Sequence, residues 1–215
     1  MNTLTTEAVA ACLAPHTPLY RRRPPVYQTV MLNALARLWQ GPHMQLLDVG
    51  GGTGVIAQAM QELLPVDTVT SVDVVDRFFD TLTVKTMVYD GTRLPFEDGH
   101  FDSATINNVL HHVPRDQRGA ILAEIRRVVN GPLYIKDHVA GRWLDHQRLK
   151  VLDAIGNLPF KGQIEAWYLT EQEWEQLAQQ GGYTIAARET GPYRTGLMER
   201  VFPNHLETTM RFDPV

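Results

Sequence analysis

The sequence is poor in cysteine and has no long apolar run. Cys12 is the only cysteine among the 215 residues, so an internal disulfide framework is excluded and the chain fits a reducing compartment. No stretch approaches the roughly 20 apolar residues of a membrane span. Near the N-terminus the basic run Arg21–Arg23 follows the apolar residues, which is the reverse of a secretory signal peptide. We therefore expect a cytoplasmic protein with no membrane partner.

The sequence also lacks an excess of positive charge. Lysine and arginine total 20 against 24 aspartates and glutamates, a formal net charge of −4. A mildly acidic chain offers phosphate backbones no general attraction, so we expect no nucleic-acid partner. With 44 % hydrophobic and 20 % charged residues, the composition is that of a globular protein, and the length predicts one domain.

Strand and helix patterns alternate along the chain. The predicted strands cover 44–49, 68–74, 83–89, 101–107, 133–139, 183–189 and 205–212. The predicted helices cover 26–40, 55–64, 118–129, 142–155 and 170–180, and a loop is expected over 156–168. Alternating strands and helices of this length predict an α/β fold in which helices cover both faces of a parallel sheet.

Glycine is concentrated just after the first predicted strand, in LLDVGGGTG, Leu46–Gly54. Open parallel sheets bind ligands at the carboxyl ends of their strands. A glycine turn there lets the backbone approach a ligand, and the following helix presents its N-terminus. A turn that serves only strand–helix packing needs one or two glycines, whereas this one has four in five residues. The stretch therefore predicts a ligand site.

The spacing of these glycines excludes two common phosphate-binding motifs. The P-loop pattern GxxxxGK[ST] is absent. The dinucleotide pattern G-x-G-x-x-G fails because its third glycine position falls on Val55. Gly50, Gly52 and Gly54 instead form G-x-G-x-G. The third glycine comes one residue earlier than in the dinucleotide motif, which argues against a pyrophosphate-binding turn.

This spacing, preceded by Leu-Asp-Val, resembles motif I of the class I S-adenosylmethionine-dependent methyltransferases. The resemblance continues in order: SVD ends the second strand at Asp73, Asp90-Gly91 ends the third, and DGTRLPFEDGHFDSATINNVLHHV (90–113) is similar to the family's LPF…FD…LHHV block. Arg126-Arg127-Val128 is similar to the segment before strand five, although Asn130-Gly131-Pro132 stands where Pro-Gly-Gly is common. The match covers about residues 45–139.

The resemblance implies a doubly wound, Rossmann-like sheet of seven strands, mostly parallel, with helices on both faces and the last strand antiparallel. No break in composition marks a linker, so we expect a single methyltransferase domain over 1–215. Its expected parts are an N-terminal helical cap (1–43), a cofactor-binding core (44–139), substrate lid helices (140–182) and closing strands (183–215).

The resemblance also implies S-adenosyl-L-methionine as the cofactor. Asp73 is expected to bind the ribose hydroxyls, because a carboxylate accepts both hydrogens of a diol, and Asp76 is a second candidate. The family's acid at Asp90 meets the adenine amino group. The cofactor-binding residues implied in this way are Asp48, Gly50, Gly51, Gly52, Gly54, Asp73, Asp90, Gly91 and Asn107.

Methyl transfer from a sulfonium is an in-line displacement in which the protein aligns a nucleophile and excludes water. A base helps when the acceptor is a hydroxyl or a protonated amine. His111, His112 and His138 follow the fourth and fifth predicted strands. They are the candidate catalytic residues, because histidine titrates near neutrality. The alternatives are a turn cap, a solvent-facing ring, a partner of Asp137, or a reaction without a base.

No metal is expected at this site. A catechol-type reaction needs a cluster of hard oxygen ligands at the strand ends. Asp137 with Asn107 and Asn108 makes only a weakly anionic group, and the following His138 suits softer metals better.

The methyl acceptor is expected to be a small molecule. Aromatic residues outside the core sheet are candidates for its pocket, with core packing as their alternative role: Tyr20, Tyr27, Trp143, His146, Phe160, Trp167 and Tyr168. Arg21–Arg23, Arg194 and Arg200 either hold an anionic substrate group or form a solvated face.

Other functions stay open. They are an inactive module that binds S-adenosylmethionine or S-adenosylhomocysteine, a methyltransferase acting on a protein or peptide, and a nicotinamide oxidoreductase. No Asn-Pro-Pro-Tyr-like tetrapeptide follows the fourth strand, where Asn107-Asn108-Val109-Leu110 stands, which disfavours a nucleic-acid base as acceptor. No stripe of residues indicates an oligomeric state.

Overall fold

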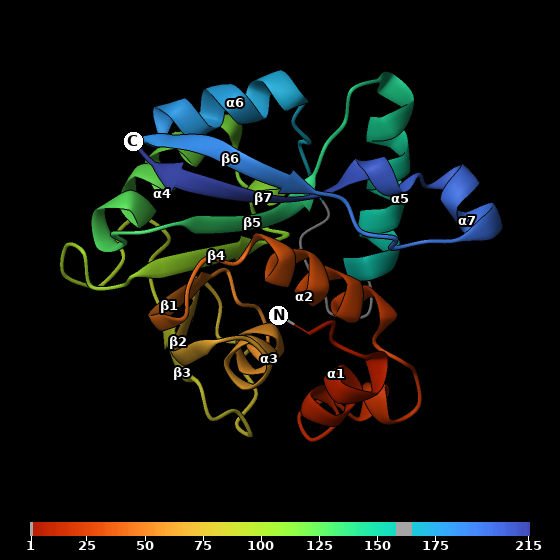
Figure 1. Cartoon of the computed structure of the whole chain (residues 1–215). Helices are drawn as coiled ribbons and strands as arrows, with labels where there is room; N and C mark the ends of the chain where they lie inside the picture. The colour runs from red at the N-terminus through yellow and green to blue at the C-terminus, as the bar shows by residue number, and fades with distance from the viewer. Residues whose placement is uncertain (1, 158–164) are drawn as a thin grey trace.

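A computed structural model describes residues 2–157 and 165–215, built around one seven-stranded sheet (Figure 1). The strand order is β3-β2-β1-β4-β5-β7-β6. The strands are β1 (His43–Val49), β2 (Val66–Asp73), β3 (Lys85–Val88), β4 (Ser103–Asn107), β5 (Leu133–His138), β6 (Tyr183–Glu189) and β7 (Glu207–Pro214). Only β7 runs antiparallel to its neighbours among the described strands. The predicted fold class is confirmed.

Helices cover both faces of the sheet. They are α1 (Thr6–Leu13), α2 (Val26–Leu38), α3 (Val55–Leu63), α4 (Arg115–Val128), α5 (Trp143–Asn157), α6 (Glu171–Gln180) and α7 (Gly196–Val201), with 3-10 turns η1 (Pro18–Arg21), η2 (Leu110–His112) and η4 (Asn204–Leu206). One face packs against α1, α2 and α3, and the other against α4 and α6. In the described part of the chain, no helix has the length and apolar character that crossing a membrane requires.

Each face has its own apolar core because strand side chains alternate in direction. On β5, Leu133 and Ile135 join the core under α4 and α6, whereas Tyr134 joins the core under α1–α3. All six residues of β5 are buried, as expected for a strand covered on both faces. The edge strand β3 is exposed throughout. The polar residues at the carboxyl end of β5 are therefore buried, whereas the edge strand β3 offers no buried position.

The N-terminal segment contains a helix that the sequence patterns did not predict. Thr5 caps α1 by accepting a hydrogen bond from the Ala8 amide, and the helix ends at Leu13, before Pro15. Cys12 is buried, and burial together with a hydrogen bond to Glu62 raises the pKa of its thiol to about 12. A buried thiol with a raised pKa carries little thiolate at neutral pH, so Cys12 is a poor nucleophile.

The carboxyl ends of the parallel strands face one end of the molecule. Helices α5 and α7 lie beyond that end, past the tip of β5 (Figure 1). Helix α4 begins at Arg115, three residues earlier than predicted, because Pro114 precedes its first turn. The predicted loop over 156–168 falls partly on 158–164, which lie outside the described residues.

Candidate functional site

The glycine turn after β1 is fastened to β2 by its own backbone. The amides of Gly50 and Gly51 both donate to the Val72 carbonyl, at 2.8 and 3.0 Å. The Gly52 amide donates to Oδ2 of Asp73 at 2.8 Å, and Oδ1 of Asp73 accepts from the Val75 amide at 3.0 Å. Asp73, which is 4 % exposed, is thus held at the edge of the turn, where the sequence placed it.

Two neighbouring glycines are required for different reasons. A Cβ on Gly51 would lie 1.8 Å from Oγ of Ser71 and 2.8 Å from Oδ2 of Asp48, so packing alone demands glycine. Gly52 has φ +59°, and a Cβ there would meet nothing within 4 Å. The backbone at Gly52 therefore borders open space that a ligand can approach closely.

Asp48 ties together the three central strands. This side chain is 2 % exposed and accepts hydrogen bonds from Oγ of Ser71 at 2.8 Å and Oγ1 of Thr105 at 2.9 Å. Burial raises the pKa of the Asp48 carboxyl, against the lowering effect of these hydroxyls. The ends of β1, β2 and β4 are thereby held beside the glycine turn.

A cavity of about 130 Å³ lies beside the turn. It is lined by Tyr27, Gln28, Met31, Asp48, Gly50, Gly51, Ile56, Asn107 and Asn108. Oδ1 of Asn107 is buried and has no hydrogen-bond partner within the described part of the protein. A buried hydrogen-bond acceptor without a partner costs about 1–3 kcal/mol. The cavity wall at Asn107 therefore suits a ligand that donates a hydrogen bond.

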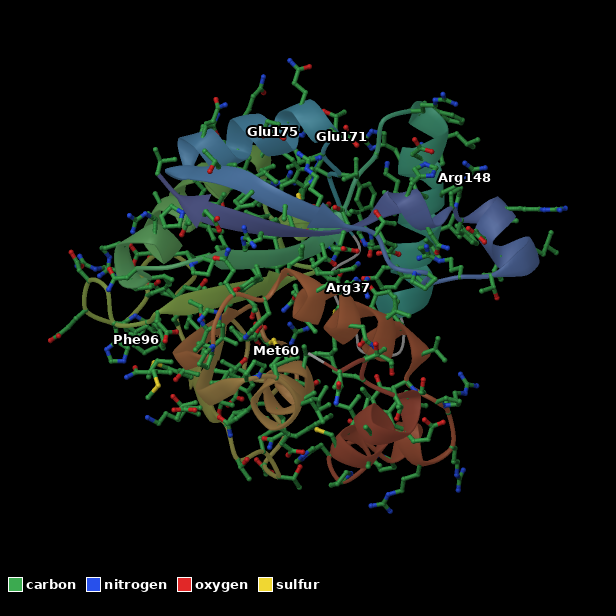
Figure 2. All side chains as sticks on the ribbon, in the orientation of Figure 1. Arg37, Met60, Phe96, Arg148, Glu171 and Glu175 are labelled. Atoms are coloured by element: carbon green, nitrogen blue, oxygen red, sulfur yellow. The ribbon has the colours of Figure 1, made fainter. Side chains whose placement is uncertain are left out.

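A larger hollow of about 600 Å³ lies elsewhere, between residues 93–98 and Arg127. It contains none of the predicted site residues. Figure 2 shows Phe96 of this hollow on the opposite side of the molecule from Arg148 of α5. We therefore place the site at the carboxyl ends of the strands and not in the larger hollow.

The second predicted acid of the cofactor region lies in a turn of its own. Asp90 follows β3 and accepts hydrogen bonds from the Arg93 amide at 3.0 Å and from the amide and hydroxyl of Thr92 at 2.8 and 2.7 Å. These donors lower the pKa of the exposed Asp90 carboxyl to about 2. The Tyr89 amide donates to the Asp73 carbonyl at 3.0 Å, which keeps the two acids on adjacent strand ends. Neither acid lines the 130 Å³ cavity.

The three predicted catalytic histidines lie together at the ends of β4 and β5. The ring centroid of His111 is 4.1 Å from that of His112 and 4.9 Å from that of His138. His111 and His112 belong to η2, and His138 ends β5. The tertiary structure therefore joins two separate sequence motifs into one cluster.

His111 lies between two carboxylates and does not face solvent. Its Nδ1 is 2.6 Å from Oδ1 of Asp137, and its Nε2 is 3.4 Å from Oδ2 of Asp153 in α5. Burial opposes charge on the ring, but the two acids outweigh it and raise the pKa of His111 to about 9. For His112, burial and the neighbouring His111 lower the pKa.

A buried ion cluster adjoins the histidines. Glu207, at the start of β7, is fully buried and forms ion pairs with both Lys136 and Arg194. Nδ1 of His138 lies 3.1 Å from Oε2 of the same carboxylate. Burial acts to raise the pKa of Glu207, but Lys136 and His138 hold it well below its usual value. Neither Glu207 nor Asp153 was predicted from the sequence. The available signal was the predicted strand ending in Lys-Asp-His, because a buried lysine needs a carboxylate partner from another segment.

Asn108 connects the cavity with this cluster. It lines the cavity, and its Oδ1 accepts from Nζ of Lys136 at 2.8 Å and from the Tyr27 hydroxyl at 3.4 Å. Its φ of +56° is the only positive value at a non-glycine position in the described chain. Such strain persists where surrounding contacts over-determine the residue, and it is typical of functional sites.

The predicted acceptor-pocket residues divide between site and surface. Tyr168 is buried, and its hydroxyl donates to Oδ2 of Asp153 at 3.0 Å. Tyr27 lines the cavity, and Arg194 belongs to the ion cluster. Among the remaining candidates, the exposed residues are Arg21–Arg23, Trp143, Trp167 and Arg200. Phe160 lies outside the described residues.

Comparisons with known proteins agree with this geometry. A family profile described as a methyltransferase domain matches residues 47–132. The ubiquinone/menaquinone biosynthesis C-methyltransferase of Cupriavidus necator is 32 % identical over 123 residues, which cover 48 % of this chain. The match spans 50 % of that relative's length.

Solved structures show the same fold over nearly the whole chain. A chain in the complex of the Haloferax volcanii Trm112 methyltransferase activator with a methyltransferase is 15 % identical, with a TM-score of 0.67 and 97 % of both chains covered. The Burkholderia thailandensis 1,6-didemethyltoxoflavin-N1-methyltransferase, solved with its acceptor and S-adenosylhomocysteine, is 18 % identical with a TM-score of 0.60. That alignment covers 98 % of this chain and 87 % of the other.

Proposed function

We propose that the chain is a class I S-adenosylmethionine-dependent methyltransferase that transfers a methyl group from S-adenosylmethionine to a small molecule. One observation carries the proposal: a cavity beside the glycine turn meets a buried polar cluster through Asn108. The first region suits the cofactor and the second suits the acceptor. A cytoplasmic location is part of the same proposal.

We assign cofactor binding to the residues around the turn. The open space at Gly52 and the unpaired Oδ1 of Asn107 fit a ligand that approaches the backbone and brings donors. Asp73 is assigned to the ribose hydroxyls and Asp90 to the adenine amino group. The remaining residues of this assignment are Asp48, Gly50, Gly51, Gly54 and Gly91. When bound, S-adenosylmethionine supplies an activated methyl group on a sulfonium.

We assign the acceptor to the region where the carboxyl ends of β4 and β5 meet the described residues of α5 and the residues that precede α6. The residues there orient the acceptor and exclude water, which accounts for most of the rate in an in-line displacement. His111, His112 and His138 are assigned to the acceptor's proton. Their proximity to Asp137, Asp153 and Glu207 supports this assignment, because each carboxylate stabilises a positive charge at the cluster.

Calorimetric titration of the purified full chain with S-adenosylhomocysteine tests the cofactor assignment, with NADH as the control ligand. We expect micromolar binding of the first and none of the second. Product analysis by mass spectrometry with candidate acceptors then separates an enzyme from an inactive binding module. Binding of NADH alone would overturn the proposal in favour of an oxidoreductase.

A further inference from the structure

Three metal-ligating side chains converge next to the histidine cluster. His111, His138 and Asp153 each offer one ligand atom, and these atoms all lie within 4.8 Å of one another. The residues come from η2, β5 and α5. Four-coordinate zinc with bonds of about 2.0–2.1 Å holds its ligand atoms about 3.4 Å apart. The 3.4 Å between Nε2 of His111 and Oδ2 of Asp153 already matches this spacing, and the widest pair must close by about 1 Å.

Each histidine has a carboxylate close to its Nδ1. Nδ1 of His111 is 2.6 Å from Asp137, and Nδ1 of His138 is 3.1 Å from Glu207. Metal-bound histidines almost always donate their second N–H to a carboxylate, a carbonyl or water, which fixes the ring and the tautomer. His111 therefore has the outer partner of a metal ligand on Nδ1 and has Nε2 left for an ion, whereas His138 has the Glu207 carboxylate close to Nδ1 without an aligned hydrogen bond.

The nitrogen that faces the candidate site lacks a hydrogen bond. Nε2 of His111 is buried without a hydrogen-bond partner in the described chain, since its approach to Asp153 at 3.4 Å is not aligned for one. His111 itself is only 2 % exposed. Buried polar atoms without partners are rare and call for an explanation, of which a bound ion is one.

The buried charges are unevenly balanced. Glu207 has two permanent cations, Lys136 and Arg194. No lysine or arginine within residues 2–157 and 165–215 forms an ion pair with Asp137 or Asp153. Buried carboxylates need a paired charge or a metal ion. The positive charge that offsets Asp137 and Asp153 in this structure lies on His111, whereas a divalent cation beside Asp153 and His111 supplies two positive charges with the imidazole rings neutral.

We propose that His111, His138 and Asp153 bind one divalent transition-metal ion, with zinc the best match to two nitrogens and one oxygen. Three protein ligands leave a fourth position open, as in catalytic zinc sites. The expectation of no metal weighed Asp137, the two asparagines and His138 but not Asp153, because nothing in the sequence brings Asp153 to this place.

The open position identifies a class of acceptor, and this part rests on the proposed function. An ion held by His111, His138 and Asp153 would lower the pKa of an acceptor hydroxyl, because the ion would stabilise the negative charge that deprotonation leaves on the oxygen. The oxygen keeps the electron pair that attacks the methyl carbon, and the carbon–sulfur bond breaks with its pair moving to sulfur. With the ion bound, His111 and His138 act as ligands in place of the proton-accepting role assigned to them above.

Metal content tests the site without any assay of activity. Bound metal is removed from the full chain with a chelator, and the chain is then incubated with Zn²⁺ and desalted. Its metal content is measured by inductively coupled plasma mass spectrometry. We expect about one zinc per chain, and at least a tenfold lower content for His138→Gln and for Asp153→Asn. Substitution with Co²⁺ should give the visible absorption of a four-coordinate nitrogen and oxygen site, and the two variants should lose it.

Two further variants separate a metal site from a merely structural cluster. His146→Gln is the matched control, because His146 lies on α5 near Tyr168 but outside the ligand set, and it should retain the metal. Asp137→Asn should weaken zinc affinity by about 10- to 100-fold, as expected for a carboxylate behind a ligand. Circular dichroism confirms that each variant is folded.

The proposal is overturned if the folded wild-type chain retains no Zn²⁺, Co²⁺, Mn²⁺ or Fe²⁺, or if Asp153→Asn and His138→Gln retain as much as the wild type. These outcomes are distinct from a failure of the proposed function. A chain that binds S-adenosylhomocysteine but retains no metal would refute the metal site alone. A chain that retains metal but does not bind S-adenosylhomocysteine would refute the cofactor assignment alone.

Discussion

The two halves of the site are built in opposite ways. At the ends of β1 and β2, the backbone makes the contacts, and the Gly52–Asp73 hydrogen bond joins residues 21 positions apart. At the ends of β4 and β5, charged side chains make the contacts, and Lys136 and Glu207 are 71 positions apart. In the proposed function, the first half recognises a ligand by the room that its backbone leaves. The second depends on a balance of buried charge that one substitution can upset.

This difference predicts different responses to mutation. Removing a contact from the glycine turn changes ligand affinity more than stability, because the turn is held by several backbone hydrogen bonds. Removing one charge from the buried cluster leaves its partners unpaired in a low-dielectric interior, which is strongly destabilising. Four experiments test this contrast.

The largest effect is expected for Glu207→Gln. Loss of this carboxylate leaves Lys136 and Arg194 facing a neutral amide, and breaking a buried ion pair costs about 3–5 kcal/mol. We expect the melting temperature to fall by on the order of 10 °C, measured by calorimetry. The double variant Lys136→Met with Glu207→Gln should recover part of the loss. A change below about 1 kcal/mol would show that the cluster is already hydrated.

The next effect is on affinity. Asp73→Ala should weaken S-adenosylhomocysteine binding by about 1.5–3 kcal/mol, or roughly 10- to 150-fold, because a charged acceptor is lost. Titration calorimetry measures the change. Asp76→Ala is the matched control, since Asp76 is exposed three residues further along the chain. Equal losses in both variants would refute the assignment of Asp73 to the ribose.

A pair of alanine variants then divides packing from ligand contact within one turn. Gly51→Ala should destabilise the fold by about 1–3 kcal/mol, because its Cβ meets Ser71 and Asp48. Gly52→Ala should lower the free energy of unfolding by about 1–2 kcal/mol because of the positive φ alone. It should weaken the free energy of ligand binding by a larger amount. Chemical denaturation and titration calorimetry together measure both. Identical profiles for the two variants would contradict the distinction.

The smallest effect is expected at the residue that joins the two halves. Asn108→Gly and Asn108→Ala both remove the acceptor for Lys136, but only glycine tolerates φ +56° without strain. The glycine variant should therefore be more stable than the alanine variant by about 1 kcal/mol. Denaturant unfolding of the pair measures this difference. An alanine variant of equal stability would mean that Asn108 adopts another backbone conformation in solution.

Much of the fold could be predicted from local patterns. The strand at residues 44–49 and the helix after Gly54 were predicted within one residue at each end, because apolar runs and glycine act on neighbouring residues. Helix α1 was missed because prolines on its C-terminal side hid a short capped helix. The site histidines were predicted individually, but their common environment was not, because Asp153 and Glu207 carry no motif.

The sequence by itself determined the alternating strands, the glycine turn and the acid at the end of the second strand, since each depends on contacts between chain neighbours or adjacent strands. Only the tertiary structure decided that His111, His138, Asp153 and Glu207 share one buried volume. Burial and charge pairing arise when segments from β5, α5 and β7 meet. No local pattern encodes that meeting, because its energy comes from excluding water from charges that lie far apart in the chain.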